Sequence, residues 1–473
     1  MHLPWYLLAL ALISATSLQL PDLPTTPVLR IDLSHLTPTE QAISIRRHID
    51  QGTPVVFQNS SVAGWPAVNK WLSEQYVSAA FNHEPLQVKV SKQPVFTLYA
   101  LDAKRRQEDI LQGGAEELNR KYKYEPMTVQ ELFHDDKPAK NFCYYSGEMP
   151  DIMQHDVHLE DLVVNTVNSK MSRGILWMGN QGVTAQTHFD RSYNMFAQIV
   201  GQKSFYLYPP GHWRDLHLYP SFFGSRRQCR YQFPLTISGH SEETCNTTTT
   251  TSSNENTRTP PISMLATLEP GELLYIPPFY FHTVVSLSTP TISYSVLSPS
   301  AEEFYYSEAL YARVPFNRVG ASGSRNLLLG VKLYIDQILS SLHRHHQHVI
   351  RTLYASRHEH LPGTVLRPED QIVVPSPDGS NPWCTFRSKI EQFKLEKKLG
   401  KKQLKEAVNN VTRVFDGSKI QNVGAVEILL HDLIEELLVF ATADGGGGEG
   451  GEGKDGRRRV ARVLRGCWLF DKL

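Results

Sequence analysis

The sequence predicts a mainly β core folded as a double-stranded β-helix, or jelly roll, with an α/β region before it and helices after it. Short strand-like runs separated by Gly and Pro turns fill the middle of the chain, which is typical of antiparallel barrels. Polar and charged residues recur inside these apolar runs, as expected where strands direct functional groups into a barrel. Beyond Ser300 the apolar residues recur at helical spacing instead.

The composition shows no bias toward a charged partner. The chain has 473 residues, which is enough for one large domain with additions or for two domains. Lys+Arg and Asp+Glu both number 48, so no overall field favours nucleic acid or an anionic membrane, and we expect no nucleic-acid partner. The five cysteines show no zinc-finger spacing.

Residues 18–140 are predicted to form the α/β region that precedes the barrel. We expect its strands at residues 28–32, 53–57 and 86–90. We expect its helices at residues 37–50, from residue 65 onward and at residues 127–133. Thr37 or Thr39 is the expected N-cap of the first helix, because a threonine hydroxyl accepts hydrogen bonds from the first turn.

Residues 141–300 are predicted to form the barrel itself. Its expected strands include residues 142–145, 174–179, 192–200 and 203–208. Gly201-Gln202 is expected to form a two-residue hairpin turn between the last two strands. Residues 222–261 interrupt the barrel with a loop-like, Thr-rich composition. A tolerated surface insertion is the simpler interpretation, and an insertion that shapes the mouth of the site is the alternative.

Residues 301–442 are predicted to be a helical region, and residues 443–473 a Gly-rich flexible tail. The expected helices span residues 326–353, 403–414 and 423–440. A homodimer formed through these C-terminal helices is compatible with their apolar residues. The first helix carries histidines with i,i+3 spacing that could chelate a metal, although a solvated polar face is the preferred interpretation; they are His343, His345, His346 and His348.

Residues 1–17 are predicted to be a signal peptide. The apolar run at residues 3–13 is too short to span a membrane, and Ala15 and Ser17 are small residues suited to a cleavage site. No Lys or Arg precedes the run, and a short membrane anchor is the alternative. We expect the protein to be located in the endoplasmic reticulum lumen or to be secreted, with the cytoplasm as the alternative location. We expect no stable membrane span after cleavage. In an oxidising compartment Cys229 and Cys245 could form a disulfide.

One stretch of the predicted barrel concentrates the chemistry. His188 and Asp190 are two positions apart, so on a strand they point to the same face. Both are costly to bury unpaired, and a bound cation would satisfy both. His282, far downstream, supplies a second imidazole, and two histidines with one carboxylate are the ligand set of non-haem iron sites with open positions. Lys203 lies inside an apolar run and needs an anionic partner.

The order and spacing of these residues, together with Gly271-Glu272 and Pro277, resemble the JmjC, cupin-like family of iron(II)- and 2-oxoglutarate-dependent oxygenases. The likeness runs from about residue 54 to residue 299 and is closest to the small protein hydroxylases of that family. It implies that His188, Asp190 and His282 bind iron(II). It also implies that 2-oxoglutarate binds the iron and that Lys203 pairs with its distal carboxylate. Dioxygen and 2-oxoglutarate would be consumed, succinate would form, and a protein or peptide side chain would be hydroxylated.

The resemblance also suggests residues around the cosubstrate. The family often has Thr or Ser three residues before the first histidine, where this chain has Ala185. The chain carries an extra residue there, so Thr184 or Thr187 is expected to take that role. Asn194 fits the family's polar group near the cosubstrate, and an internal hydrogen-bonding role is the alternative.

A tyrosine of the strand at residues 142–145 often contacts 2-oxoglutarate in the family. Tyr144 or Tyr145 is the candidate here, with Tyr145 as the first choice, and an aromatic that fills the barrel wall is the alternative for either. Two other functions stay open at this stage. One is a non-catalytic, metal-containing cupin-like binding protein. The other is a protein lysine demethylase, which the predicted signal peptide and the lack of a zinc-binding reader pattern disfavour.

Overall fold

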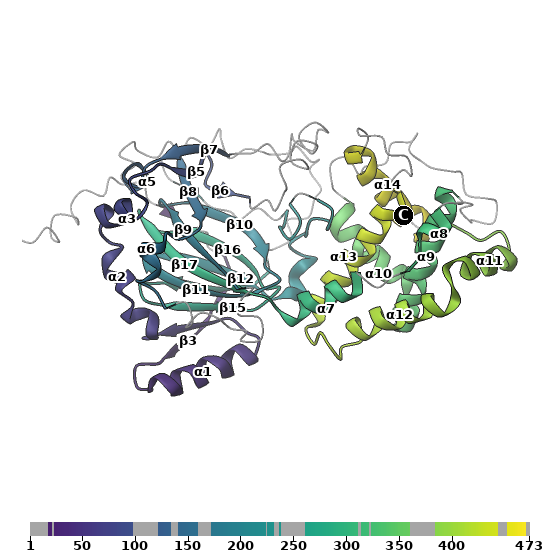
Figure 1. The fold of residues 1–473 in the computed structure, drawn as a ribbon, viewed down its shortest axis with the longest axis horizontal. Coiled ribbons are helices and arrows are strands. Elements are labelled where there is room, and N and C mark those ends of the chain that lie inside the picture. Colours follow the sequence, from purple (N-terminus) through teal and green to yellow (C-terminus); the bar gives the residue numbers. More distant parts are fainter. Residues whose placement is uncertain are drawn as a thin grey trace, which may run out of the picture.

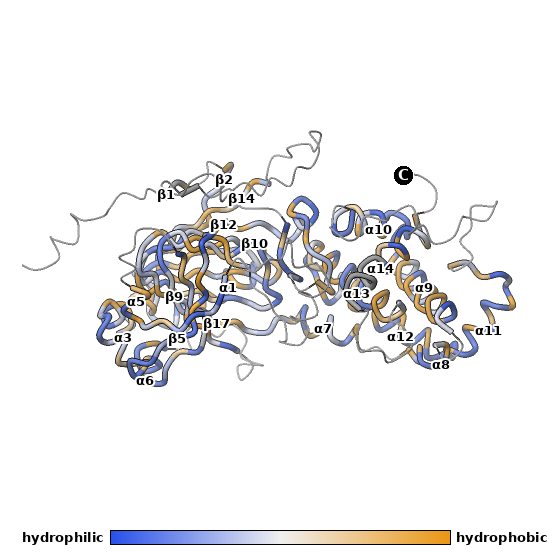
Figure 2. The backbone as a smooth tube through the Cα atoms, turned by 90° about the horizontal axis from the view of Figure 1, so that it is seen from above, coloured by the Kyte–Doolittle hydropathy of each residue, from blue (hydrophilic) through white to orange (hydrophobic). Residues whose placement is uncertain are grey.

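The computed structural model describes residues 18–20, 23–97, 122–133, 141–158, 172–223, 225–230, 236–237, 261–310, 314–320, 323–359, 384–442 and 452–469. Figure 1 shows two lobes, a β barrel and a helical bundle, and Figure 2 shows the same two lobes from above. The predicted signal peptide and most of the 222–261 insertion lie outside the described part. Within the described residues, no helix combines the length and apolarity that a bilayer span requires.

The N-terminal region places short strands and helices along one side of the barrel. Its helices are α1 (Pro38–Asp50), α2 (Pro66–Lys70), α3 (Glu74–Ala80) and α5 (Val129–Phe133). Thr37 caps α1 as expected: its side chain accepts from the Glu40 backbone N–H, and the Glu40 carboxylate accepts from the Thr37 N–H at 2.8 Å. This reciprocal capping box satisfies two amides that would otherwise lack partners, and it confirms the predicted start of the helix.

The barrel consists of two facing sheets, as predicted for a jelly roll. The larger sheet has the order β3 (Leu29–Asp32), β4 (Val55–Gln58), β15 (Leu273–Ile276), β11 (Tyr193–Val200), β17 (Thr291–Ser298), β9 (Arg173–Gly179), β8 (Phe142–Gly147), β5 (Leu86–Ser91) and β7 (Tyr122–Met127). The smaller sheet has the order β2 (Thr25–Pro27), β14 (Ser263–Leu268), β12 (Lys203–Tyr208), β16 (Phe281–Ser286), β10 (Thr184–Phe189) and β6 (Val95–Phe96). Side chains from both sheets meet between them, among them Phe196 of β11 and Phe205 of β12.

The turn at Gly201-Gln202 connects β11 to β12, but the two strands do not pair. β11 belongs to the larger sheet and β12 to the smaller one, so the turn carries the chain across the barrel and the predicted hairpin is wrong. Gly201 has a φ of 69°, and a Cβ there would lie 2.5 Å from the carbonyl oxygen of Pro290. Only glycine fits this crossing without strain.

The helical lobe packs against the outer face of the smaller sheet. Its helices are α7 (Ala301–Leu310), α8 (Asn317–Gly320), α9 (Ser324–Ser341), α10 (His346–Leu353), α11 (Lys389–Leu399), α12 (Lys401–Phe415), α13 (Val423–Thr442) and α14 (Glu452–Trp468). The α13 helix is buried along most of its length, and its neighbours share one core with Tyr206 and Tyr208 of β12. This shared core joins the lobe to the barrel.

Two predictions for this lobe are wrong. The helix expected over residues 326–353 is two helices, α9 and α10, because the chain turns at His343, which has a φ of 53°. The flexible tail expected over residues 443–473 is helical over Glu452–Trp468, and Val460, Ala461 and Leu464 are buried in the core. The glycines before α14 had suggested that this segment is flexible. It is helical because its apolar side chains form one face that packs against the core.

The cysteines also differ from the expectation. Cys384 and Cys467 form a disulfide that links the segment before α11 to the end of α14. Cys229 is a buried free thiol, and Cys245, with which it could form a disulfide, lies outside the described residues. Burial raises the pKa of the Cys229 thiol well above its ordinary value, which keeps it protonated.

Candidate metal centre

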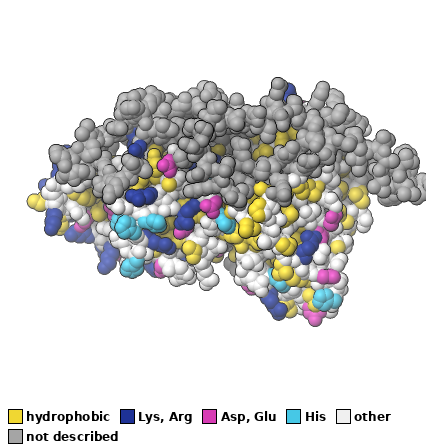
Figure 3. Space-filling view, turned by 180° about the vertical axis from the view of Figure 1, so that it is seen from behind, with side chains coloured by type: hydrophobic (Ala, Val, Ile, Leu, Met, Phe, Trp, Pro, Cys, Tyr) yellow, Lys and Arg dark blue, Asp and Glu magenta, His cyan; other side chains and the backbone are white. Residues whose placement is uncertain are grey.

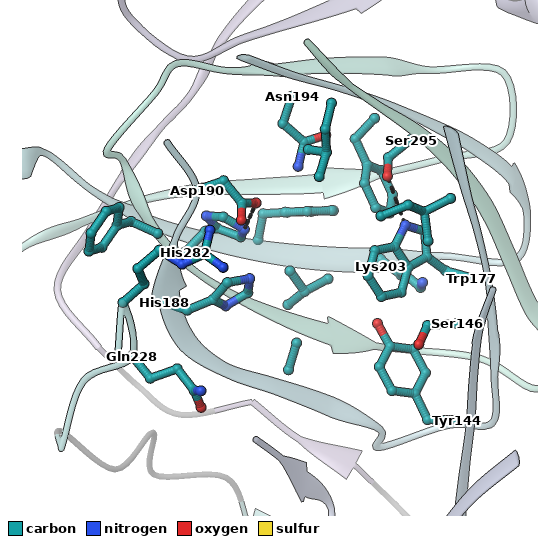
Figure 4. A pocket seen from close by; sticks show the side chains of 18 of the residues that line it. Tyr144, Ser146, Trp177, His188, Asp190, Asn194, Lys203, Gln228, His282 and Ser295 are labelled. Carbon is teal, nitrogen blue, oxygen red and sulfur yellow. Dashed lines mark hydrogen bonds and ion pairs between the residues drawn. The ribbon is translucent and has the colours of Figure 1, made fainter. Parts of the chain in front are cut away.

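Two adjacent strands of the smaller sheet bring three ligand-type side chains together. His188 on β10 lies directly opposite His282 on β16, with ring centroids 4.2 Å apart. Asp190 follows β10, and its Oδ2 lies 3.8 Å from His282 Nε2. One ligand atom from each residue lies within 4.8 Å of the others. In the part of the chain that the structure describes, this is the one group of three or more such side chains with that geometry, and Figure 4 shows it at one end of a cavity.

Backbone contacts orient both imidazoles toward the centre. His188 Nδ1 lies 2.6 Å from the carbonyl oxygen of Gln186, and His282 Nδ1 lies 3.1 Å from that of Tyr280. A carbonyl oxygen only accepts hydrogen bonds, so each Nδ1 carries the proton and each Nε2 keeps a free lone pair. Fixing a tautomer through the second ring nitrogen is how proteins orient histidine ligands to metals.

The protonation states also suit a cation. Burial, then the neighbouring His282, lowers the pKa of His188 to about 4. Burial alone would raise the pKa of Asp190, but His188, His282 and Arg227 outweigh it and hold that pKa below its ordinary value. At neutral pH the centre therefore offers the Asp190 carboxylate and a neutral His188 imidazole, which fits a divalent iron and its open coordination positions.

A cavity of about 330 Å³ extends from this centre between the two sheets. The smaller sheet contributes Lys203 and Phe205 of β12 to its wall, and the larger sheet contributes Tyr144 of β8 and Trp177 of β9. The rings of Tyr144 and Trp177 stack with centroids 5.7 Å apart, and Trp177 Nε1 donates to Ser295 Oγ at 2.8 Å. The volume is in the range of sites for small ligands.

A family model described as "Cupin-like domain" matches residues 40–298, more than half of the chain. The chain belongs to this JmjC, cupin-like family. This match confirms the family resemblance and the fold class that the sequence predicted. The family comprises iron(II)- and 2-oxoglutarate-dependent oxygenases, and the three ligand-type residues of this chain fit that metal.

Two curated relatives illustrate the similarity. The chain is 28% identical over 269 residues to "Lysine-specific demethylase JMJ30" of Arabidopsis thaliana, covering 53% of this chain and 51% of that protein. It is 23% identical over 300 residues to "Jumonji C domain-containing protein 5" of Drosophila melanogaster, covering 59% of this chain and 64% of that protein. The matches therefore span about half to two thirds of the relatives' length.

Lys203 of this cupin-like domain lies inside the cavity, as predicted. Its side chain is 2% exposed, and Nζ lies 5.5 Å from the centroid of the Phe196 ring. The ammonium group has no acidic partner among the described residues. Burial lowers the pKa of Lys203 to about 7. A bound anion would supply the missing partner.

Asn194 also lies in the cavity, close to the metal centre in Figure 4. Its Oδ1 is buried and has no hydrogen-bond donor in the described structure. An orphaned buried oxygen has a free-energy cost, so this amide is poised for a bound ligand or water. Within the described residues, that oxygen makes no internal hydrogen bond.

The tyrosine prediction is corrected by one position. Tyr145 points away from the cavity, packs edge-to-face on Phe81 and donates from its hydroxyl to the Glu148 carbonyl at 3.1 Å. Tyr144 is the residue that lines the cavity. Successive side chains on a strand alternate between faces, so only one of the two could point inward, and the cross-barrel packing decides which.

The threonine predictions are wrong for a related reason. Thr184 Oγ1 donates to the Gly182 carbonyl at 3.0 Å, and Thr187 Oγ1 lies 2.7 Å from Thr283 Oγ1, so both hydroxyls bond within the barrel wall. β10 carries a bulge between Ala185 and His188. The extra residue shifts the alternation, and Ala185 instead of a threonine shares the cavity face with His188.

The first residues of the insertion fit the alternative interpretation, in which the insertion shapes the mouth of the site. Residues 225–230 run beside β10: the Phe189 N–H donates to the Arg227 carbonyl at 3.0 Å, and the Cys229 N–H donates to the Thr187 carbonyl at 2.9 Å. Arg226, Arg227 and Gln228 thereby line the cavity. The simpler interpretation, a tolerated surface insertion, is wrong for these residues.

Lys89 on β5 is a cavity residue that sequence reasoning missed. It lines the cavity from the larger sheet and is 8% exposed. The sequence feature that could have revealed Lys89 is its position between Val88 and Val90. Both valines are buried in the core on the opposite side of that sheet. Alternation puts Lys89 on the other face, and only the closed barrel shows that this face is covered.

Proposed function

We propose that this chain is an iron(II)- and 2-oxoglutarate-dependent dioxygenase that hydroxylates a side chain of a protein or peptide and converts 2-oxoglutarate to succinate. The observation that carries this proposal is Lys203, a buried lysine without an acidic partner in the cavity that begins at His188, Asp190 and His282. A metal site alone does not require such a lysine. A dicarboxylate that binds the metal at one end does, because its far carboxylate must be neutralised inside the barrel.

The proposed reaction assigns a separate role to each group of cavity residues. His188, Asp190 and His282 would hold the iron, which supplies the activation of dioxygen when bound. Lys203 would bind the far carboxylate of 2-oxoglutarate. The amide of Asn194 would contact the ligand near the metal end. The stacked rings of Tyr144 and Trp177 exclude water from the wall of the cavity and thereby strengthen these electrostatic contacts.

A lysine demethylase is the second candidate, because the Arabidopsis relative carries that activity in its name. A methylated lysine brings a positive charge to the reacting carbon. The described cavity wall of this chain contains five Lys or Arg side chains, and Asp190 is its only carboxylate. Like charges in a cavity disfavour a cationic substrate, and we therefore favour hydroxylation.

A peptide-library screen with iron(II), 2-oxoglutarate and dioxygen tests the proposal. We expect stoichiometric succinate and a product heavier by one oxygen atom. Loss of a methyl group would identify a demethylase instead. Binding of iron without any peptide-stimulated succinate across a broad library would favour a non-catalytic cupin-like binding protein.

Replacing Lys203 with Met is expected to raise the KM for 2-oxoglutarate by at least about a hundredfold, because a buried carboxylate that loses its partner costs about 3–5 kcal/mol. Metal content should stay close to wild type, since the lysine is not a ligand. Both quantities are measured on one preparation, by turnover assay and metal analysis. An unchanged KM with normal iron would show that Lys203 does not bind the cosubstrate.

The same lysine gives a second, non-catalytic readout. Its pKa in the empty cavity is about 7, below the ordinary value of a lysine, so it is mostly neutral above that pH. A bound carboxylate favours the charged form. Binding of 2-oxoglutarate near pH 9 should therefore take up a proton, measurable by calorimetry in buffers of different ionisation enthalpy, and the Lys203→Met variant should take up none.

We also propose that the protein enters the secretory pathway. The apolar leader at residues 3–13 and the Cys384–Cys467 disulfide support this, because disulfides persist in oxidising compartments. Mass spectrometry of the natural protein should find an N-terminus near Leu18 and a peptide linked through Cys384 and Cys467. A protein that begins at Met1 with reduced cysteines would place it in the cytoplasm.

A further inference from the structure

The cavity holds a second buried ammonium group that the proposed reaction does not use. Lys89 reaches into it from β5 of the larger sheet, whereas Lys203 enters from β12 of the smaller sheet. Lys89 Nζ donates to Ser146 Oγ at 3.0 Å and lies 5.5 Å from the centroid of the Tyr144 ring. It is 8% exposed and has no carboxylate partner among the described residues.

This arrangement stabilises a charge only in part. A hydroxyl and the faces of the Tyr122 and Tyr144 rings offset some of the lost hydration. They do not replace a counter-ion, and burial lowers the pKa of Lys89 to about 8. The two lysines enter the cavity from different sheets, and Lys89 is held there by its hydrogen bond to Ser146.

The described wall as a whole is rich in basic side chains. They are Lys89, Arg173, Lys203, Arg226 and Arg227. Asp190 is its only acidic side chain, and a bound divalent metal would more than neutralise that carboxylate. On the protein face in Figure 3, by contrast, Lys and Arg lie scattered among apolar and acidic side chains. The described wall of the cavity therefore carries more basic than acidic side chains.

One dicarboxylate cosubstrate leaves this charge partly unmatched. Its metal end meets His188, Asp190 and His282, and its far end meets Lys203. Lys89 remains on the opposite sheet, where Ser146 holds it. An anionic group of the substrate would give Lys89 a counter-ion. The low dielectric constant of the cavity wall would strengthen the attraction between the two charges.

We propose that Lys89, held by Ser146, recognises a carboxylate of the substrate, so that the preferred substrates are acidic peptides with an Asp or Glu near the oxidised residue. This inference rests on the proposed function and adds the chemical class of its substrate. Lys89 is a specificity-determining residue here, since its charge selects the substrate and leaves the reacting atoms to other groups.

Anaerobic binding tests the proposal without turnover. The full chain is loaded with iron(II) and 2-oxoglutarate under argon and titrated with matched peptides that differ only by Glu or Gln at one position. We expect the Glu peptide to bind at least about tenfold more tightly, which corresponds to about 1.4 kcal/mol. C-terminally amidated peptides form a second arm, which separates a side-chain carboxylate from a terminal one.

Two variants assign the effect to Lys89. Lys89→Met should abolish the Glu preference, and Lys89→Glu should favour a matched Lys peptide. The affinity of both variants for 2-oxoglutarate should stay within about twofold of wild type, a change well below the tenfold that corresponds to about 1.4 kcal/mol. Retained binding of 2-oxoglutarate also shows that the fold is intact. Lys203→Met is the matched control: it should weaken 2-oxoglutarate binding and leave the Glu-to-Gln ratio unchanged.

The outcomes separate this inference from the proposed function. Equal binding of Glu and Gln peptides to the wild type, or a Glu preference that survives in Lys89→Met, would overturn the role of Lys89. A loss of 2-oxoglutarate affinity in Lys89→Met with an unchanged peptide preference would also overturn it, because Lys89 would then serve the cosubstrate. Absence of succinate with every peptide would instead reject the dioxygenase, whatever the binding preference.

Discussion

Alanine in place of His188, Asp190 or His282 is expected to abolish iron-dependent turnover of 2-oxoglutarate. Each side chain offers one of three ligand atoms that lie within 4.8 Å of one another. Changes in groups that merely orient a ligand typically lower metal affinity about 10- to 100-fold, so loss of a ligand itself should exceed that range. Metal analysis and succinate release on the purified variants measure both parts of the effect.

The fold should survive these substitutions, because the three residues meet at one end of a cavity whose walls are packed by other side chains. His343→Ala is a suitable control, since that histidine is exposed and lies in the helical lobe. It should keep wild-type metal content and turnover. A triad variant that retains full activity would remove that residue from the ligand set.

Loss of Asp432 is expected to destabilise the protein strongly. Its Oδ1 lies 2.7 Å from Arg357, which is fully buried, and its Oδ2 lies 2.7 Å from Arg191. Arg357 also bonds Glu435 at 2.8 Å. Asp432 thus joins α13 to the residue that follows the metal-ligand candidate Asp190. In Asp432→Ala, Arg357 keeps only one of its two carboxylate partners, and Arg191 loses its ion pair. Removing one partner of a buried ion pair lowers the free energy of unfolding by about 3–5 kcal/mol.

Urea unfolding of the full chain measures this effect as a lower midpoint at an unchanged slope. Glu406→Ala is the matched control, because its ion pair with Lys402 is long and solvent-exposed and contributes little. The two variants should differ clearly in midpoint. Wild-type stability of Asp432→Ala would mean that the buried arginines find water or another acceptor in the folded protein.

The sequence predicted the type of barrel and the three residues that meet in the candidate metal centre. His188, Asp190 and His282 are residue types that bind metals and are costly to bury unpaired, and their order and spacing, which resemble the family, singled them out. Lys203 followed from the same reasoning, since it shares its strand face with Phe205 and Leu207. Capping by Thr37 is local, so it too could be predicted.

Only the tertiary structure decided which neighbours of these residues face the cavity. The bulge in β10 turns Thr184 and Thr187 into the wall, and cross-barrel packing selects Tyr144 over Tyr145. Bulges and strand partners depend on contacts between segments far apart in the chain, which no local pattern records. Lys89 shows the same limit: its strand alternates like any half-exposed strand, and closure of the barrel is what buries its charge.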